Sequence, residues 1–279
     1  INHYFEDSPF FNLQGRLKTN TKYSGNLSFD SNFTKYFLAS THTSKTSFYE
    51  TSFMYENFPH KFNFNTLDCT FKNNQIKIKN SNLTIADSDL NFTGNITDLI
   101  GYIFKKKDVI NIAGNLEATY VKFDELLSLK DTSKETESEN MPNWINADLN
   151  TSIKNFSYDD FMGSDITGQL NYNNQILKGQ NIKLRSLNGS IGGNFKFYTS
   201  KRNKLTLFSQ LNIKQLNIRN AFLAFNNFNQ DFITSKHIKG IGTAEIQMQA
   251  SWNPGFIFAE EDLKVKSHLV IEKGELIQF

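Results

Sequence analysis

Residues that could catalyse a reaction or bind a metal ion are scattered along this sequence. The five histidines stand far apart, with no pair at metal-ligand spacing, which favours solvated side chains over a metal site. Residues Asp87–Asn91 (DSDLN) imitate the start of a calcium loop, but the sixth position of that loop is Phe92 instead of glycine, so the polar face of a strand explains them better. Asp159–Asp160 and Glu260–Asp262 are acidic loops, and adjacent carboxylates on a loop rarely make an acid–base pair without a cleft.

Three further features have a structural explanation. Gly189–Gly193 (GSIGG) could suggest a phosphate loop, but no Lys-Ser/Thr follows and no helix begins there, so a turn is expected. Lys105–Lys107 could touch anionic headgroups, although lysines on a loop are usually solvated. Cys69 alternates with Leu67 and Phe71, which predicts a small apolar core residue instead of a nucleophile. None of these patterns indicates an enzyme, a metal site or a bound cofactor.

The composition bounds the class of protein. The 279 residues include 30 Lys and Arg against 28 Asp and Glu, a net charge of +2 that gives no electrostatic case for a nucleic-acid partner. Aromatic residues make up 14%, led by 27 Phe, and strands favour such side chains. The single Cys69 excludes an internal disulfide. No apolar run approaches the roughly 20 residues of a membrane-spanning helix. The chain begins in mid-pattern, and we expect a piece of a longer protein.

Residues 163–218 carry the clearest secondary-structure pattern. Apolar side chains fall at every second position, as in Leu205–Ile213, where Ser209 shares the apolar face. This period of two predicts strands with one apolar and one polar face. The runs of alternating apolar residues are separated by residues that tolerate the backbone conformations of turns. This arrangement predicts antiparallel strands joined by tight turns. These turns are expected at Asn173–Asn174, Lys178–Gly179, Asn188–Gly189 and Arg202–Asn203.

The same pattern extends over the rest of the chain. One-sided alternation runs from Phe62 to Phe92 and returns at 145–149, at 244–252 and at 263–271. Residues 48–58 are apolar on both faces, so we expect that strand to be covered twice. Short helices are predicted at Asp124–Leu129, at Arg219–Phe225 and at 97–104, the last with Thr97 as a possible cap.

An internal repeat relates the two halves of the chain. KNNQI at 72–76 and YNNQI at 172–176 each lead through two strands to a Gly-Asn step. Each half then reaches a strand pair that ends on a short helix. The repeat predicts one elongated β domain with repeat-like halves at 1–129 and 143–279, joined by the polar loop 130–142.

Short motifs in a fixed order give residues 145–279 a resemblance to a known family. A strand ending in Gly192–Gly193 precedes an alternating apolar step, Leu211–Ile218, that leads into a short helix. A glycine-led strand (GIG) follows, and then a hairpin at Lys273–Gly274. In this order the motifs resemble the C-terminal region of AsmA-like proteins, and the repeat extends the resemblance to residues 62–129.

The resemblance implies a mostly β fold, a long twisted antiparallel sheet curled into an open groove with a few short helices. Members of the family are bacterial envelope proteins exposed to the periplasm, usually tethered to the inner membrane by an N-terminal helix. Such a helix is absent from these 279 residues, and we expect it in the longer parent protein. Members of the family resemble bridge-like lipid carriers. The resemblance therefore implies a periplasmic, membrane-anchored parent protein with possible envelope protein partners and a role in outer-membrane biogenesis.

Together, the pattern and the resemblance favour non-enzymatic binding and passive conduction of phospholipid or other acyl chains along an apolar groove. The predicted helices are too short to cover a sheet of a dozen strands, so its apolar face must curl, pair with another sheet or hold lipid. The residues expected to line the groove are Leu205, Leu207, Leu211, Ile213, Ile246, Met248, Trp252, Val265, Leu269 and Ile271.

Three other interpretations remain open. The apolar face could be the core of an ordinary β-sandwich. The protein could be a cell-surface adhesin or glycan-binding module with a closed core, in which exposed aromatic residues stack on sugars. It could also be a scaffold whose strand edges template the assembly of outer-membrane proteins. The candidate sugar-stacking residues are Tyr23, Tyr36, Tyr49 and Tyr55.

Overall fold

The protein is mostly β, with 70% strand and 11% helix. Its strands form one 14-stranded sheet in which β1 to β13 follow the order of the chain and β14 also pairs with β12. The sheet is not closed into a barrel, and four short helices accompany it within the described residues. The prediction of a long open sheet with a few short helices is confirmed. The computed structural model describes residues 10–26, 33–55, 58–104, 107–127, 141–200, 202–254 and 257–277.

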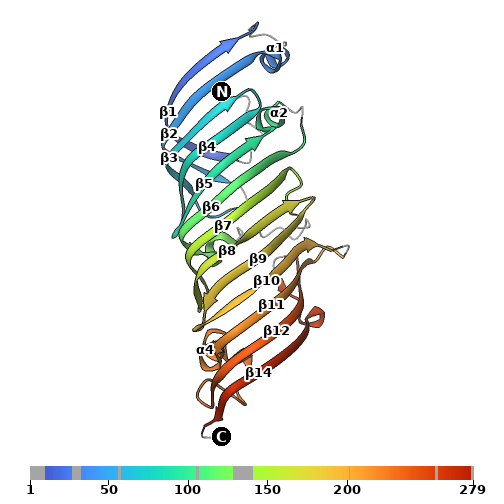
Figure 1. Cartoon of the computed structure of the whole chain (residues 1–279). Coiled ribbons are helices and arrows are strands. Elements are labelled where there is room, and N and C mark those ends of the chain that lie inside the picture. The colour runs from blue at the N-terminus through green and yellow to red at the C-terminus, as the bar shows by residue number, and fades with distance from the viewer. Residues whose placement is uncertain are drawn as a thin grey trace. The chain divides into compact units, whose positions relative to one another are not determined.

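The elements follow one another along the chain, and Figure 1 labels most of them. The strands are β1 (Phe10–Ser24), β2 (Thr41–Tyr55), β3 (Phe62–Lys72), β4 (Gln75–Ile85), β5 (Ser88–Thr97), β6 (Ile110–Lys122), β7 (Ile145–Tyr158), β8 (Phe161–Asn173), β9 (Ile176–Ser186), β10 (Gly189–Thr199), β11 (Leu205–Asn217), β12 (Ile238–Asn253), β13 (Ile257–Phe258) and β14 (Lys264–Leu276). The helices are α1 (Phe33–Ala39), α2 (Leu99–Ile103), α3 (Phe123–Leu127) and α4 (Ile218–Ala224), with 3₁₀ turns η2 (Asn226–Asn229) and η3 (Glu260–Asp262).

Contacts divide the chain into two compact units. Unit 1 comprises residues 1–120, 125–133 and 143–149, and unit 2 comprises 121–124, 134–142 and 150–279. The predicted linker 130–142 lies outside the described residues, apart from its last two positions. Among the described residues, no helix is both long and apolar enough to cross a membrane.

One pair of neighbouring strands runs in parallel. At the start of β6, the backbone N–H of Ile110 donates to the carbonyl of Trp144, 2.9 Å away and just before β7. The Asn146 side chain donates to the Asn111 side chain at 3.0 Å. The first residues of β6 and β7 therefore lie together, and the sheet is mixed.

The predicted helices are present, with one error at a cap. Helices α2, α3 and α4 occupy the three predicted segments, while α1 was not predicted. Thr97 does not cap α2, because the residue before the helix is Asp98, in a left-handed conformation with φ 66°. The Asp98 carboxylate instead accepts hydrogen bonds from the side chains of Asn74 and Asn111, at 2.9 and 3.0 Å.

The core of unit 1 is centred on Cys69. Its side chain is buried with Ile76 and Ile78, and Phe48 and Phe92 pack against this cluster. Burial, followed by the nearby Asp68 carboxylate, raises the pKa of the Cys69 thiol to about 11. The thiol therefore stays protonated at neutral pH, and the interpretation of Cys69 as a small core residue is confirmed.

The predicted turn at Lys178–Gly179 is wrong. Both residues lie inside β9, and the reversal occurs at Asn174 and Gln175, which have φ 49° and 60°. Gly179 has a packing role instead, since a Cβ atom there would lie 2.1 Å from the Phe195 ring. The ring on β10 occupies the space that a side chain on β9 would fill.

We predict that Gly179→Ala destabilises the protein by about 1–3 kcal/mol, because the added methyl group must displace the Phe195 ring from a packed position. Gly192→Ala is the matched control on the next strand. Its added Cβ would meet no atom closer than the Ile182 carbonyl oxygen, at 3.5 Å. Urea unfolding of the two variants checks the prediction, and equal midpoints would contradict it.

Candidate functional site

The ten predicted lining residues lie on one face of unit 2. Direct partners across an antiparallel pair point to the same side of a sheet. Leu211 is opposite Ile246, and Met248 is in turn opposite Val265. The other predicted residues join the same face through the pairs Leu205↔Trp252, Leu207↔Ala250, Ile213↔Ala244, Ala244↔Leu269 and Gly242↔Ile271.

Strands β9 and β10 extend this face beyond the predicted residues. Ile191 is opposite both Ile213 on β11 and Leu184 on β9, and Phe197 is opposite Leu207. The sequence carried the signal, because these residues alternate with polar ones as the β11 residues do. We name the combined surface on β9–β12 and β14 the apolar face.

The apolar face is covered to different degrees along the sheet. Leu205 is buried, while Leu207, Leu211 and Met248 are half-buried. The three β14 residues are open to solvent, with exposures of 56% for Val265, 55% for Leu269 and 46% for Ile271. The whole of β14 is exposed, including Val270 on the opposite face at 45%. Its three residues on the apolar face nevertheless form a contiguous exposed apolar patch, a feature that is uncommon on soluble monomers.

Aromatic and helical residues bound the apolar face at its two ends. At one end, a Cβ atom on Gly242 would lie 3.4 Å from Ile218 of α4 and 3.7 Å from Leu269, so α4 covers the face there. At the other end, the Trp252 ring packs against Phe197 and Phe258, with ring centroids 6.2 and 5.8 Å apart. Neighbouring side chains therefore cover the face at its Gly242 end and at its Trp252 end.

Ser209 is a polar exception within the apolar face. It lies opposite Phe195 and Met248, and it is only 3% exposed. Its Oγ atom has no hydrogen-bond partner among the described residues. Taller apolar neighbours therefore close over this short side chain, and the surface that a guest molecule meets is apolar.

The other candidate residues have local partners. The Glu260–Asp262 loop neutralises Lys204, whose Nζ atom lies 3.0 Å from Glu261 and 2.8 Å from Asp262. Asp159 starts the turn after β7, and its N–H donates to the Asp124 carboxylate at 2.8 Å. Among the residues that the structure describes, no three His, Cys, Asp or Glu side chains gather as metal ligands would. Lys105 lies outside the described residues.

The segment Asp87–Asn91, which resembles the start of a calcium loop, hydrogen-bonds to backbone groups of the sheet. The Asp89 carboxylate accepts hydrogen bonds from the N–H groups of Thr119 and Tyr120, at 2.8 and 2.7 Å. Asn91 accepts one from the Ser81 N–H at 3.2 Å. Partial burial alone would raise the pKa of Asp89, but the N–H bonds from Tyr120 and Thr119 outweigh it and hold the pKa below its usual value.

We predict that Asp89→Asn lowers the free energy of unfolding by about 1–2 kcal/mol at pH 7, because an amide oxygen accepts these bonds more weakly than a carboxylate. Since the pKa of Asp89 is lower in the folded state, its contribution is complete above pH ~4 and disappears as the pH falls further. Urea unfolding between pH 7 and 3 measures the difference, with the exposed Asp108→Asn as control. A difference that stays constant with pH would contradict this explanation.

The four candidate sugar-stacking tyrosines do not form a common exposed platform. Tyr23 on β1, Tyr36 on α1 and the β2 residues Tyr49 and Tyr55 are all half-buried. The Tyr23 hydroxyl donates to the Asn26 carbonyl at 2.8 Å.

Comparison of the chain with protein-family models, with curated proteins and with solved structures finds no match.

Proposed function

We propose that the protein binds the acyl chains of lipids along the apolar face and lets them move along it passively. The observation that carries the proposal is the continuity of apolar side chains across β9–β12 to the exposed Val265, Leu269 and Ile271 of β14. A sheet that is not closed into a barrel supports access from the side. Lipid headgroups would remain in water while the tails lie on the face.

The energetics favour acyl chains as guests. Each methylene removed from water contributes about 0.8 kcal/mol, so a 16-carbon tail that crossed water alone would forgo roughly 13 kcal/mol. A continuous apolar face removes much of this barrier. The proposed function makes and breaks no covalent bond, and it requires no cofactor.

The cellular setting is part of the proposal. We place the protein in the bacterial periplasm, as part of a longer protein held at the inner membrane, where it would contribute to lipid transport toward the outer membrane or to outer-membrane biogenesis. This rests on the resemblance of residues 145–279 to AsmA-like proteins. Its protein partners would then lie in the envelope.

The experiment is to purify the protein without detergent, extract it with organic solvent and analyse the extract by mass spectrometry. We expect phospholipid or another acyl lipid in near-stoichiometric amount. The purified protein should also take up a fluorescent fatty acid, and added phospholipid should displace the probe. A folded protein that carries no lipid and takes up no probe would contradict the proposal.

A further inference from the structure

The polar face of unit 2, on the opposite side of the sheet from the apolar face, concentrates positive charge. Seven cationic side chains and one carboxylate, that of Glu245, share the part of this face that we consider. This part comprises β9, β10 and β11 together with the paired segments 243–251 of β12 and 264–270 of β14. The whole chain has a net charge of only +2, so its composition conceals this asymmetry. Arg185 contacts Asp165 of β8 at 3.7 Å. The cations are Lys178, Lys183, Arg185, Lys196, Lys214, Lys264 and Lys266.

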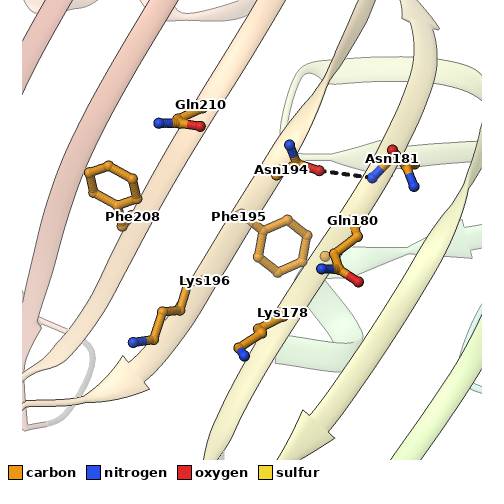
Figure 2. A pocket seen from close by; sticks show the side chains of 9 residues that line it. Lys178, Gln180, Asn181, Asn194, Phe195, Lys196, Phe208 and Gln210 are labelled. Carbon is orange, nitrogen blue, oxygen red and sulfur yellow. Dashed lines mark hydrogen bonds between the residues drawn. The ribbon is translucent and has the colours of Figure 1, made fainter.

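A depression of about 410 Å³ lies within this polar face, over β9, β10 and β11. A bulge in β9 helps to form it, since the register with β10 shifts between Gly193 and Phe195. At the bulge Asn181 has φ 53°, and its N–H donates to the Asn194 side chain at 2.9 Å. Figure 2 shows the polar side chains of three neighbouring strands around this hollow.

Two lysines oppose each other directly at the depression. Lys178 and Lys196 are cross-strand partners, and like charges at such positions destabilise a sheet. Among the ion pairs of the described residues, none involves either ammonium group. Lys196 lies 4.5 Å from the centre of the Tyr198 ring. An anionic group placed between the two lysines would turn a repulsive pair into an attractive site.

The rest of the lining suits a sugar. Phe208 is 41% exposed on the same face, and it is the direct partner of Lys196. The electron-rich face of an aromatic ring attracts the polarised C–H groups of a sugar. Gln180, Asn194 and Gln210 line the same depression, and their amide groups both donate and accept hydrogen bonds, as sugar hydroxyls require.

We infer that this depression binds an anionic saccharide, a sugar that bears a phosphate or carboxylate group. Lys178 and Lys196 hold the anionic group, the ring of Phe208 lies against the sugar, and the amide side chains bond its hydroxyls. The site is on the opposite face of the sheet from the proposed lipid surface, so neither depends on the other.

Calorimetric titration at physiological ionic strength tests the inference with glucose 6-phosphate, trigalacturonate, glucose and inorganic phosphate as probes. We expect at least one of the two anionic sugars to bind about tenfold more tightly than glucose or phosphate alone. The double variant Lys178→Gln/Lys196→Gln should weaken that binding about tenfold through the loss of two ion pairs. Phe208→Ala should weaken sugar binding severalfold and leave phosphate binding unchanged.

The control is Lys214→Gln/Lys266→Gln, which removes the same charge from the same face outside the depression and should change the affinity less than about twofold. Circular dichroism verifies folding, and Lys178→Gln alone replaces the double variant if that protein is unstable. If the two double variants weaken the binding of the anionic sugar equally, the binding is due to general electrostatic attraction to the face, and the inference is overturned. Anionic sugars that bind no more tightly than inorganic phosphate would overturn it as well.

Discussion

Replacing Met248 by aspartate is expected to abolish lipid binding while the protein stays folded. Met248 is half-buried at the middle of the apolar face, between Ser209 on β11 and Val265 on β14. A carboxylate at this position keeps its access to water, so the cost to folding should stay below about 2 kcal/mol. An alkyl chain crossing it would have to desolvate the charge. We expect at least a tenfold loss of co-purified lipid by mass spectrometry.

The control for this change is Gln249→Asp. It introduces the same carboxylate one residue later on β12, where the side chain points to the polar face opposite Phe208. Lipid content and the urea midpoint should both remain close to those of the unchanged protein. If Met248→Asp instead unfolds the protein, the apolar face is a closed core and the proposal of lipid conduction falls.

Phe156→Ala should have the largest effect on stability. Phe156 on β7 is 5% exposed, and its ring centroid lies 5.9 Å from that of Phe123 and 5.7 Å from that of Phe161. Gly163 packs beneath it, because a Cβ atom there would lie 2.6 Å from the Phe156 ring. Removing a buried phenyl ring from such a site costs about 3–5 kcal/mol. Urea unfolding measures the loss.

Tyr158→Ala provides the comparison on the same strand. Tyr158 is 47% exposed, and its truncation should cost less than about 1 kcal/mol. Lipid bound per folded molecule should be unchanged in both variants, because neither residue belongs to the apolar face. Similar losses of stability in both variants would contradict the assignment of Phe156 to a buried aromatic core.

The two pairs of variants separate two kinds of apolar surface in one sheet. Around Phe156, rings from β7, β8 and α3 cover one another, and their burial stabilises the fold. Along β11, β12 and β14, apolar side chains share a face, but those on β14 remain more than 40% exposed. Stability should therefore respond to the first surface and ligand content to the second.

The sequence alone determined the strands and the sides to which their residues point. A strand repeats every two residues, so the alternation around Leu207, Leu211 and Ile246 places these side chains on one face wherever the strands pair. The same rule identified Cys69 as a core residue. Short-range signals also located α3 and α4, because Phe123–Leu127 and Ile218–Ala224 interrupt the alternation.

Only the tertiary structure decided which contacts those faces make. The parallel pairing of β6 with β7, the hollow at the β9 bulge and the opposition of Lys178 to Lys196 each depend on register. Register joins residues far apart in the chain, and one extra residue in a strand changes which partners meet. Exposure depends in the same way on what covers a strand. Val265 and Ile153 both alternate with polar residues, yet the first is 56% exposed and the second 5%. The alternation of residues along a strand specifies the side of the sheet to which each side chain points. Whether that side is buried depends on elements elsewhere in the chain.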